Sequence, residues 1–85
     1  MSGPAWKTAA DVAEGYLTLS PPVLKKLPQG EMASLQSELE KAARDLRSQV
    51  IPADDSDGAQ KRNRKLQRLS QAALVLSAFR SRMGR

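Results

Sequence analysis

The feature that most constrains the fold is a stripe of apolar residues within the segment 30–51. Its members recur every three or four positions, at Met32, Leu35, Leu39, Ala42, Leu46 and Val50. Side chains at this spacing share one face of an α-helix. Pro52 follows the last of them and predicts the end of the helix. We therefore expect a long amphipathic helix that must bury this stripe against another element.

A second apolar stripe of the same period predicts that other element. It runs through the segment from Ala59 to about Met83, with apolar residues at Leu66, Leu69, Ala73, Leu76, Phe79 and Met83. Asp57 is followed three residues later by Gln60, which is a capping pattern for a helix N-terminus. Two helices of similar length joined by the short linker 52–58 are expected to fold back as an antiparallel hairpin.

Residues 1–28 predict two shorter elements. Thr8 with Asp11 three residues later resembles a capping box, and it predicts a short helix from about Thr8 to Leu17. Ser20 followed by Pro21 predicts a second helix start, and this helix cannot extend beyond a later proline at position 28.

Together these patterns predict an all-α protein. We expect residues 1–28 to form a short helix and a proline-limited connector, packed on a helical hairpin made by residues 29–85. The chain has 85 residues and three aromatic side chains (Trp6, Tyr16 and Phe79), so its core is limited and mainly aliphatic. A core of this size raises the expectation that a partner or a second copy completes the fold.

The residue types exclude several kinds of chemistry. The chain contains no cysteine and no histidine, so disulfides, thiolate sites, the commonest zinc sites and nucleophile–imidazole pairs are excluded. Its five glycines are scattered and form no phosphate-binding loop. We expect no enzyme activity, cofactor or metal. No apolar stretch approaches the roughly 18 residues of a membrane span, and the first residues lack a secretory signal pattern, so we expect a soluble intracellular protein.

A run of positive charge opens the last helical segment. Its members are Lys61, Arg62, Arg64, Lys65 and Arg68. The net charge of the chain is +5, and no acid occurs from Ala59 to Arg85. One interpretation places these side chains along the hairpin edge with their charged ends in water, opposite acids of the preceding helix at Glu38, Glu40 and Asp45. A second is docking to an acidic protein surface. A third is phosphate binding in nucleic acid, although no aromatic residue interleaves with the run to stack on bases.

The stretch from Ala72 to Phe79 is apolar around most of the helix, so the hairpin partner covers only part of it. Leu74 and Val75 need another cover, which could be the N-terminal helix with Trp6, Val12 and Tyr16, a second copy, or a different protein. Beside them runs an uncharged sector, formed by Asn63, Gln67, Ser70, Leu74 and Ser77. Depletion of charge is typical of interface centres, and a buried contact within the chain gives the same pattern.

Two functional hypotheses follow. The first is a small non-enzymatic helical interaction module (an adaptor, assembly subunit or chaperone-like partner) that binds an acidic or apolar helical surface, or a second copy, by helix-on-helix burial. Its apolar contacts would be Leu69, Leu74, Val75, Leu76 and Phe79, and the basic side chains that steer an acidic partner would be Arg62, Lys65 and Arg68. The alternative is a nucleic-acid-binding accessory protein that uses Lys61, Arg62, Arg64, Lys65 and Arg68.

Overall fold

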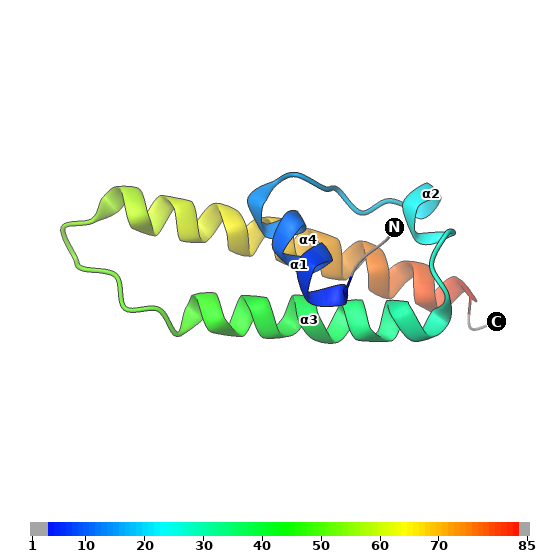
Figure 1. Ribbon diagram of the computed structural model, residues 1–85. Helices are drawn as coiled ribbons and strands as arrows, with labels where there is room; N and C mark the ends of the chain where they lie inside the picture. The colour runs from blue at the N-terminus through cyan, green and yellow to red at the C-terminus, as the bar shows by residue number, and fades with distance from the viewer. Residues whose placement is uncertain (1–3, 84–85) are drawn as a thin grey trace.

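A computed structural model describes residues 4–83, and over this range all its regular structure is helical. The helices are α1 (Ala5–Glu14), α2 (Pro21–Leu24), α3 (Gln29–Arg47) and α4 (Ser56–Met83). The two long helices, α3 and α4, lie side by side in opposite directions, and α1 packs on both of them (Figure 1). The molecule is elongated, with extents of 48 × 24 × 18 Å. The predicted helical hairpin with short N-terminal helices packed on it is confirmed.

Helix α1 lies three residues closer to the N-terminus than the sequence predicts. It begins after Pro4, and Thr8 is inside the helix, where its hydroxyl donates a long hydrogen bond to the Pro4 carbonyl at 3.5 Å. The predicted capping box at Thr8 is therefore wrong. The helix ends before Gly15, which adopts the left-handed conformation with φ of 84°. The Gly15 and Tyr16 N–H groups bond back to the Val12 and Asp11 carbonyls, a Schellman motif that stops the helix three residues before the predicted end.

The connector after α1 follows the prediction more closely. Ser20 directly precedes α2 and Pro21 is its first residue, although the Ser20 side chain makes no capping bond. The short helix ends at Leu24, and Pro28 directly precedes α3. Leu19, Leu24 and Leu27 are buried. The connector therefore contributes three leucines to the core although it contains only one turn of helix.

The loop between α3 and α4 starts earlier than the sequence predicts. Helix α3 ends at Arg47, because Val50 and Ile51 are β-branched and Ile51 is held out of the helical region by Pro52. The assignment of Val50 to the buried stripe is wrong, since it lies beyond the helix and is 95% exposed.

The cap of α4 is also displaced from its predicted position. Asp55, not Asp57, caps the helix, and its Oδ1 accepts a hydrogen bond from the Gly58 N–H at 2.9 Å. The helix therefore begins at Ser56, and Asp57 lies in its first turn. A carboxylate in the first turn is still favourable, because it faces the positive end of the helix dipole.

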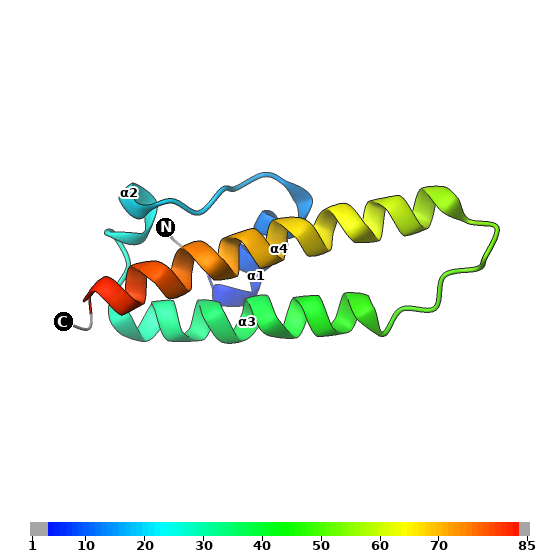
Figure 2. The ribbon, with the colours of Figure 1, turned by 180° about the vertical axis from the view of Figure 1, so that it is seen from behind.

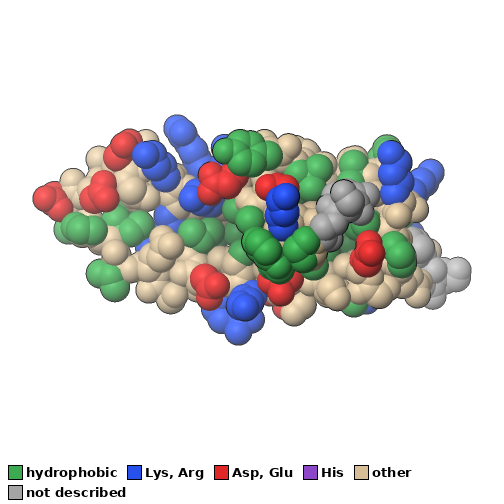
Figure 3. All heavy atoms as spheres, in the orientation of Figure 1, with side chains coloured by type: hydrophobic (Ala, Val, Ile, Leu, Met, Phe, Trp, Pro, Cys, Tyr) green, Lys and Arg blue, Asp and Glu red, His purple; other side chains and the backbone are tan. Residues whose placement is uncertain are grey.

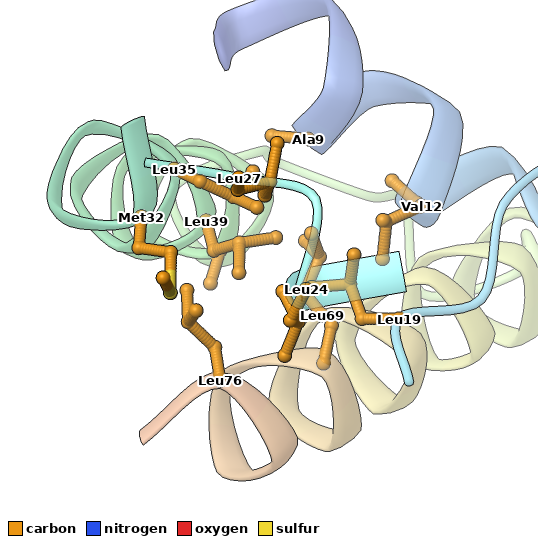
Figure 4. Close-up of a cluster of buried hydrophobic side chains, with 13 residues drawn as sticks. Ala9, Val12, Leu19, Leu24, Leu27, Met32, Leu35, Leu39, Leu69 and Leu76 are labelled. Atoms are coloured by element: carbon orange, nitrogen blue, oxygen red, sulfur yellow. The ribbon is translucent and has the colours of Figure 1, made fainter. Parts of the chain in front are cut away.

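The hydrophobic core lies where α1, α3, α4 and the connector meet (Figure 4). Helix α3 contributes Met32, Leu35 and Leu39, as the apolar stripe predicts, while Ala42 and Leu46 are only partly buried. The other buried apolar side chains come from α1, the connector and α4, and they include Ala9, Val12, Leu19, Leu24, Leu27, Leu69, Ala72 and Leu76. Each fully buried leucine stabilises the fold by about 1.5–3 kcal/mol.

Candidate interaction surface

Two residues of the basic run hold the C-terminal end of α1 on α4. Arg68 donates a hydrogen bond from Nη1 to the Ala13 carbonyl at 3.0 Å, and Lys65 Nζ lies 2.9 Å from Glu14 Oε1. The last carbonyls of a helix carry partial negative charge, so cations are stabilising there. The Arg68 guanidinium also packs close to Gly15, where an added Cβ would lie 3.1 Å from Cζ. These two side chains therefore form a clamp between elements that are distant in sequence.

The other three residues of the basic run differ from one another in burial and in contacts. Arg62 is half-buried and donates from Nη1 to the Gln49 carbonyl at 3.4 Å, while its buried Nε has no hydrogen-bond partner among the described residues. Lys61 lies 3.9 Å from Asp57 in an exposed pair one helical turn apart, which stabilises by less than about 1 kcal/mol. Arg64 is exposed, and it makes no ion pair or side-chain hydrogen bond within residues 4–83.

The acids that face the run are not the predicted ones. Across the described part of the chain, no ion pair joins the run to Glu38, Glu40 or Asp45. Its carboxylate partners are Glu14 of α1 and Asp57 of α4 itself. The reason is that α1 packs against α4 and brings its C-terminal carboxylate to Lys65. Figure 3 shows acidic side chains at the loop end of the hairpin with basic side chains beside them.

The three cations predicted to steer a partner therefore contact their own chain. Arg62, Lys65 and Arg68 each make a hydrogen bond or an ion pair with another element. Lys61 and Arg64 are exposed and contact no other element in the described range: Lys61 pairs only with Asp57 of the same helix, and Arg64 makes no ion pair or side-chain hydrogen bond. The run therefore forms mainly an edge of the packed structure.

The apolar residues predicted to contact a partner divide by burial. Leu69 and Leu76 are 1% and 0% exposed and belong to the core, so a partner cannot reach them in this conformation. Val75 and Phe79 are partly buried against the core. Leu74 is 67% exposed. It is therefore the one apolar residue of the predicted set that presents most of its side chain to solvent.

The N-terminal helix does not cover Leu74. Val12 is buried, whereas Trp6 and Tyr16 are 62% and 80% exposed. Helix α1 packs against both α3 and α4, and its end is clamped by Lys65 and Arg68. Lys65 lies on the opposite side of α4 from Leu74, since helical positions advance by about 100° per residue, whereas Arg68 lines the same groove as Leu74.

A groove of about 970 Å³ lies between α4 and the segment that follows α1. Residues 15–20 pass alongside α4 in both ribbon views (Figures 1 and 2), and Gly15, Leu17, Thr18 and Leu19 line the groove. The wall formed by α4 contains four residues of the predicted uncharged sector, Asn63, Gln67, Ser70 and Leu74. Most of the sector that the sequence marks as free of charge is thus exposed and lines one wall of a groove, where Arg68 is its charged neighbour.

Within the described part of the chain, no group of three or more acidic side chains is placed to hold a metal ion. No helix among residues 4–83 is long and apolar enough to cross a membrane. Comparison of the chain with protein families, curated proteins and solved structures found no match.

Proposed function

We propose that this protein is a non-enzymatic helical interaction module, an adaptor, assembly subunit or chaperone-like partner, and that its partner docks along the exposed side of α4. The observation that carries this proposal is the groove beside α4, whose α4 wall combines the exposed Leu74 with uncharged polar side chains and a single charged one, Arg68, which is bonded to the Ala13 carbonyl. Interface centres are depleted of charge in the same way. In this view the buried core of α3 and α4 serves as a rigid support for the docking surface.

The side chains of the groove suit protein contacts. Leu74 offers an apolar contact, and Asn63, Gln67 and Ser70 offer hydrogen-bond donors and acceptors. Leu17 and Leu19 add apolar surface from the opposite wall.

A nucleic-acid-binding function is the second candidate, and the absence of acids from Ala59 to Arg85 favours it. It is the weaker candidate because Lys65 and Arg68, the central cations of the run, are already bonded to α1. Phosphate binding through the remaining cations would weaken steeply as salt concentration rises.

The first test is affinity purification of the full chain from its native cells at moderate salt, with nuclease treatment. The wild-type chain is compared with Leu74→Ala and with Val50→Ala, a control at an exposed valine in the loop between α3 and α4. We expect a stoichiometric protein partner that Leu74→Ala loses and Val50→Ala retains, with helicity unchanged by circular dichroism. Loss of all bound material on nuclease treatment would instead assign the protein to nucleic-acid binding. A partner retained by Leu74→Ala would exclude the groove as its site.

A further inference from the structure

The exposed side of α4 contains a second seam with the period of a coiled coil. Six exposed positions follow one another at steps of four, three, four, three and four residues. We call them the outer seam: Asn63, Gln67, Ser70, Leu74, Ser77 and Ser81. A period of 3.5 residues keeps side chains facing one neighbouring helix over several turns. The outer seam therefore has the spacing along which a second helix can pack on α4 over several turns.

The outer seam differs from the exposed side of α3. Exposed positions of α3 include charges of both signs, among them Glu40, Lys41, Arg44 and Asp45. That mixture is usual for a helix face in contact with water. The outer seam contains no charge over about five turns, although α4 is rich in charged residues elsewhere. Serine at positions 70, 77 and 81 also leaves room for a second backbone to approach closely.

Exposed arginines flank the outer seam near both of its ends. Arg64 and Arg82 are 18 residues apart, which is about five full turns or about 27 Å, so they lie on the same side of α4. Both are exposed. Between Ala59 and Met83 no carboxylate is present to balance them. A helix that lies on the outer seam therefore meets a positive charge near each end.

This charge pattern argues against a second copy as the occupant. If two α4 helices paired through their outer seams in parallel, Arg64 and Arg82 of each helix would face the other flank of the partner helix, which has no carboxylate from Ala59 to Met83. If they paired in opposite directions, Arg64 would face Arg82. Neither arrangement gives these arginines a carboxylate of the second α4, and the antiparallel one places like charges together, which opposes association.

We propose that the outer seam binds an amphipathic helix of a partner protein, about five turns long, with carboxylates near both ends and an apolar residue opposite Leu74. This inference rests on the function proposed above and specifies the partner for the same side of α4, where Asn63, Gln67, Ser70 and Leu74 of the outer seam line the groove. The apolar contact would supply affinity at the centre, and the two arginines would fix the position of the helix and speed its encounter.

Photo-cross-linking of the full chain in its native cells tests this proposal. Benzoylphenylalanine is introduced at Ser70 in the outer seam and, as a control, at Ser37, an exposed serine of α3. Cross-linked peptides are sequenced by mass spectrometry. We expect the Ser70 probe to label a segment with helical periodicity and acids near both ends, and the Ser37 probe not to label it. Combined Arg64→Glu and Arg82→Glu substitutions should lower the yield of this adduct about fivefold to tenfold, because two attractive contacts become repulsive, whereas Arg64→Lys with Arg82→Lys should retain it.

Several results would overturn the inference. The Ser70 probe could give no adduct, or an adduct to a second copy, to nucleic acid or to a segment without acids. The Ser37 probe could label the same segment equally well. The yield of the Ser70 adduct could also be unchanged by the charge reversal. If the purification above yields a partner that depends on Leu74 while cross-linking gives one of these results, the proposed function stands and only the acidic helix is refuted. If no stoichiometric protein is recovered in that purification, the proposed function itself fails.

Discussion

Two leucines on α4, five residues apart, should respond very differently to truncation. Leu69 is 1% exposed in the core, and Leu74 is 67% exposed in the groove. Truncation of a fully buried leucine to alanine costs about 2–5 kcal/mol. A chain of this length has a total stability of roughly 4–13 kcal/mol, so Leu69→Ala should remove a large fraction of it. Leu74→Ala loses little buried surface and should cost about 0.5 kcal/mol or less.

Urea unfolding followed by circular dichroism measures both variants. With a denaturant dependence of about 1 kcal/mol per molar urea, the midpoint should fall by about 2 M or more for Leu69→Ala and by less than about 0.5 M for Leu74→Ala. Partner binding should show the opposite pattern, with Leu74→Ala losing it while remaining folded. If the two variants were destabilised equally, Leu74 would be a core residue, and both the orientation of α4 and the proposed docking surface would be refuted.

Three further predictions concern the ends of the helices and the clamp. Gly15→Ala should destabilise the fold by about 1 kcal/mol in the same urea assay, because the left-handed conformation is strained for alanine and its Cβ would press on Arg68. The control is Gly30→Ala, in α3 with open space around it, which should instead stabilise the fold by up to about 1 kcal/mol. A stabilising Gly15→Ala would contradict the Schellman motif. Asp55→Ala should cost about 1 kcal/mol by removing the cap on the Gly58 N–H, and Asp55→Asn should cost much less; equal losses would exclude a capping role. Arg68→Met should lower the stability by about 0.5–1.5 kcal/mol, because it removes the hydrogen bond to the Ala13 carbonyl. Amide hydrogen exchange should then accelerate more in α1 than in α3. Equal acceleration in both helices would mean that Arg68 does not act through α1.

The positions of the long helices were predictable because their signals are local. The apolar spacing from Met32 to Leu39 reports directly which face of the helix is buried, and the core confirms it. The ends of helices were less predictable, since several residues compete to cap them. Asp55 and Asp57 both have the right chemistry, and Gly15 ends α1 through a backbone conformation that any glycine could adopt.

The uncharged sector of α4 was also visible in the sequence, because residues without charge recur there at helical spacing, but the pattern did not show whether that sector is exposed or buried. Its neighbours in space were not visible. The groove has a second wall only because residues 15–19 pass alongside α4. Nothing in the pattern of either segment specifies that pairing.

The sequence by itself thus determined two long amphipathic helices, a short loop and therefore a hairpin, since periodicity and loop length act within one segment. Only the tertiary structure decided what the basic run does. Arg68 and Ala13 are 55 residues apart, and their contact depends on how α1 packs across the whole core. A cation has the same appearance in a sequence whether it faces water, a partner or the carbonyl end of a distant helix. The packing of α1 assigns Lys65 and Arg68 to the clamp and leaves Leu74 and Arg64 on the open side of α4.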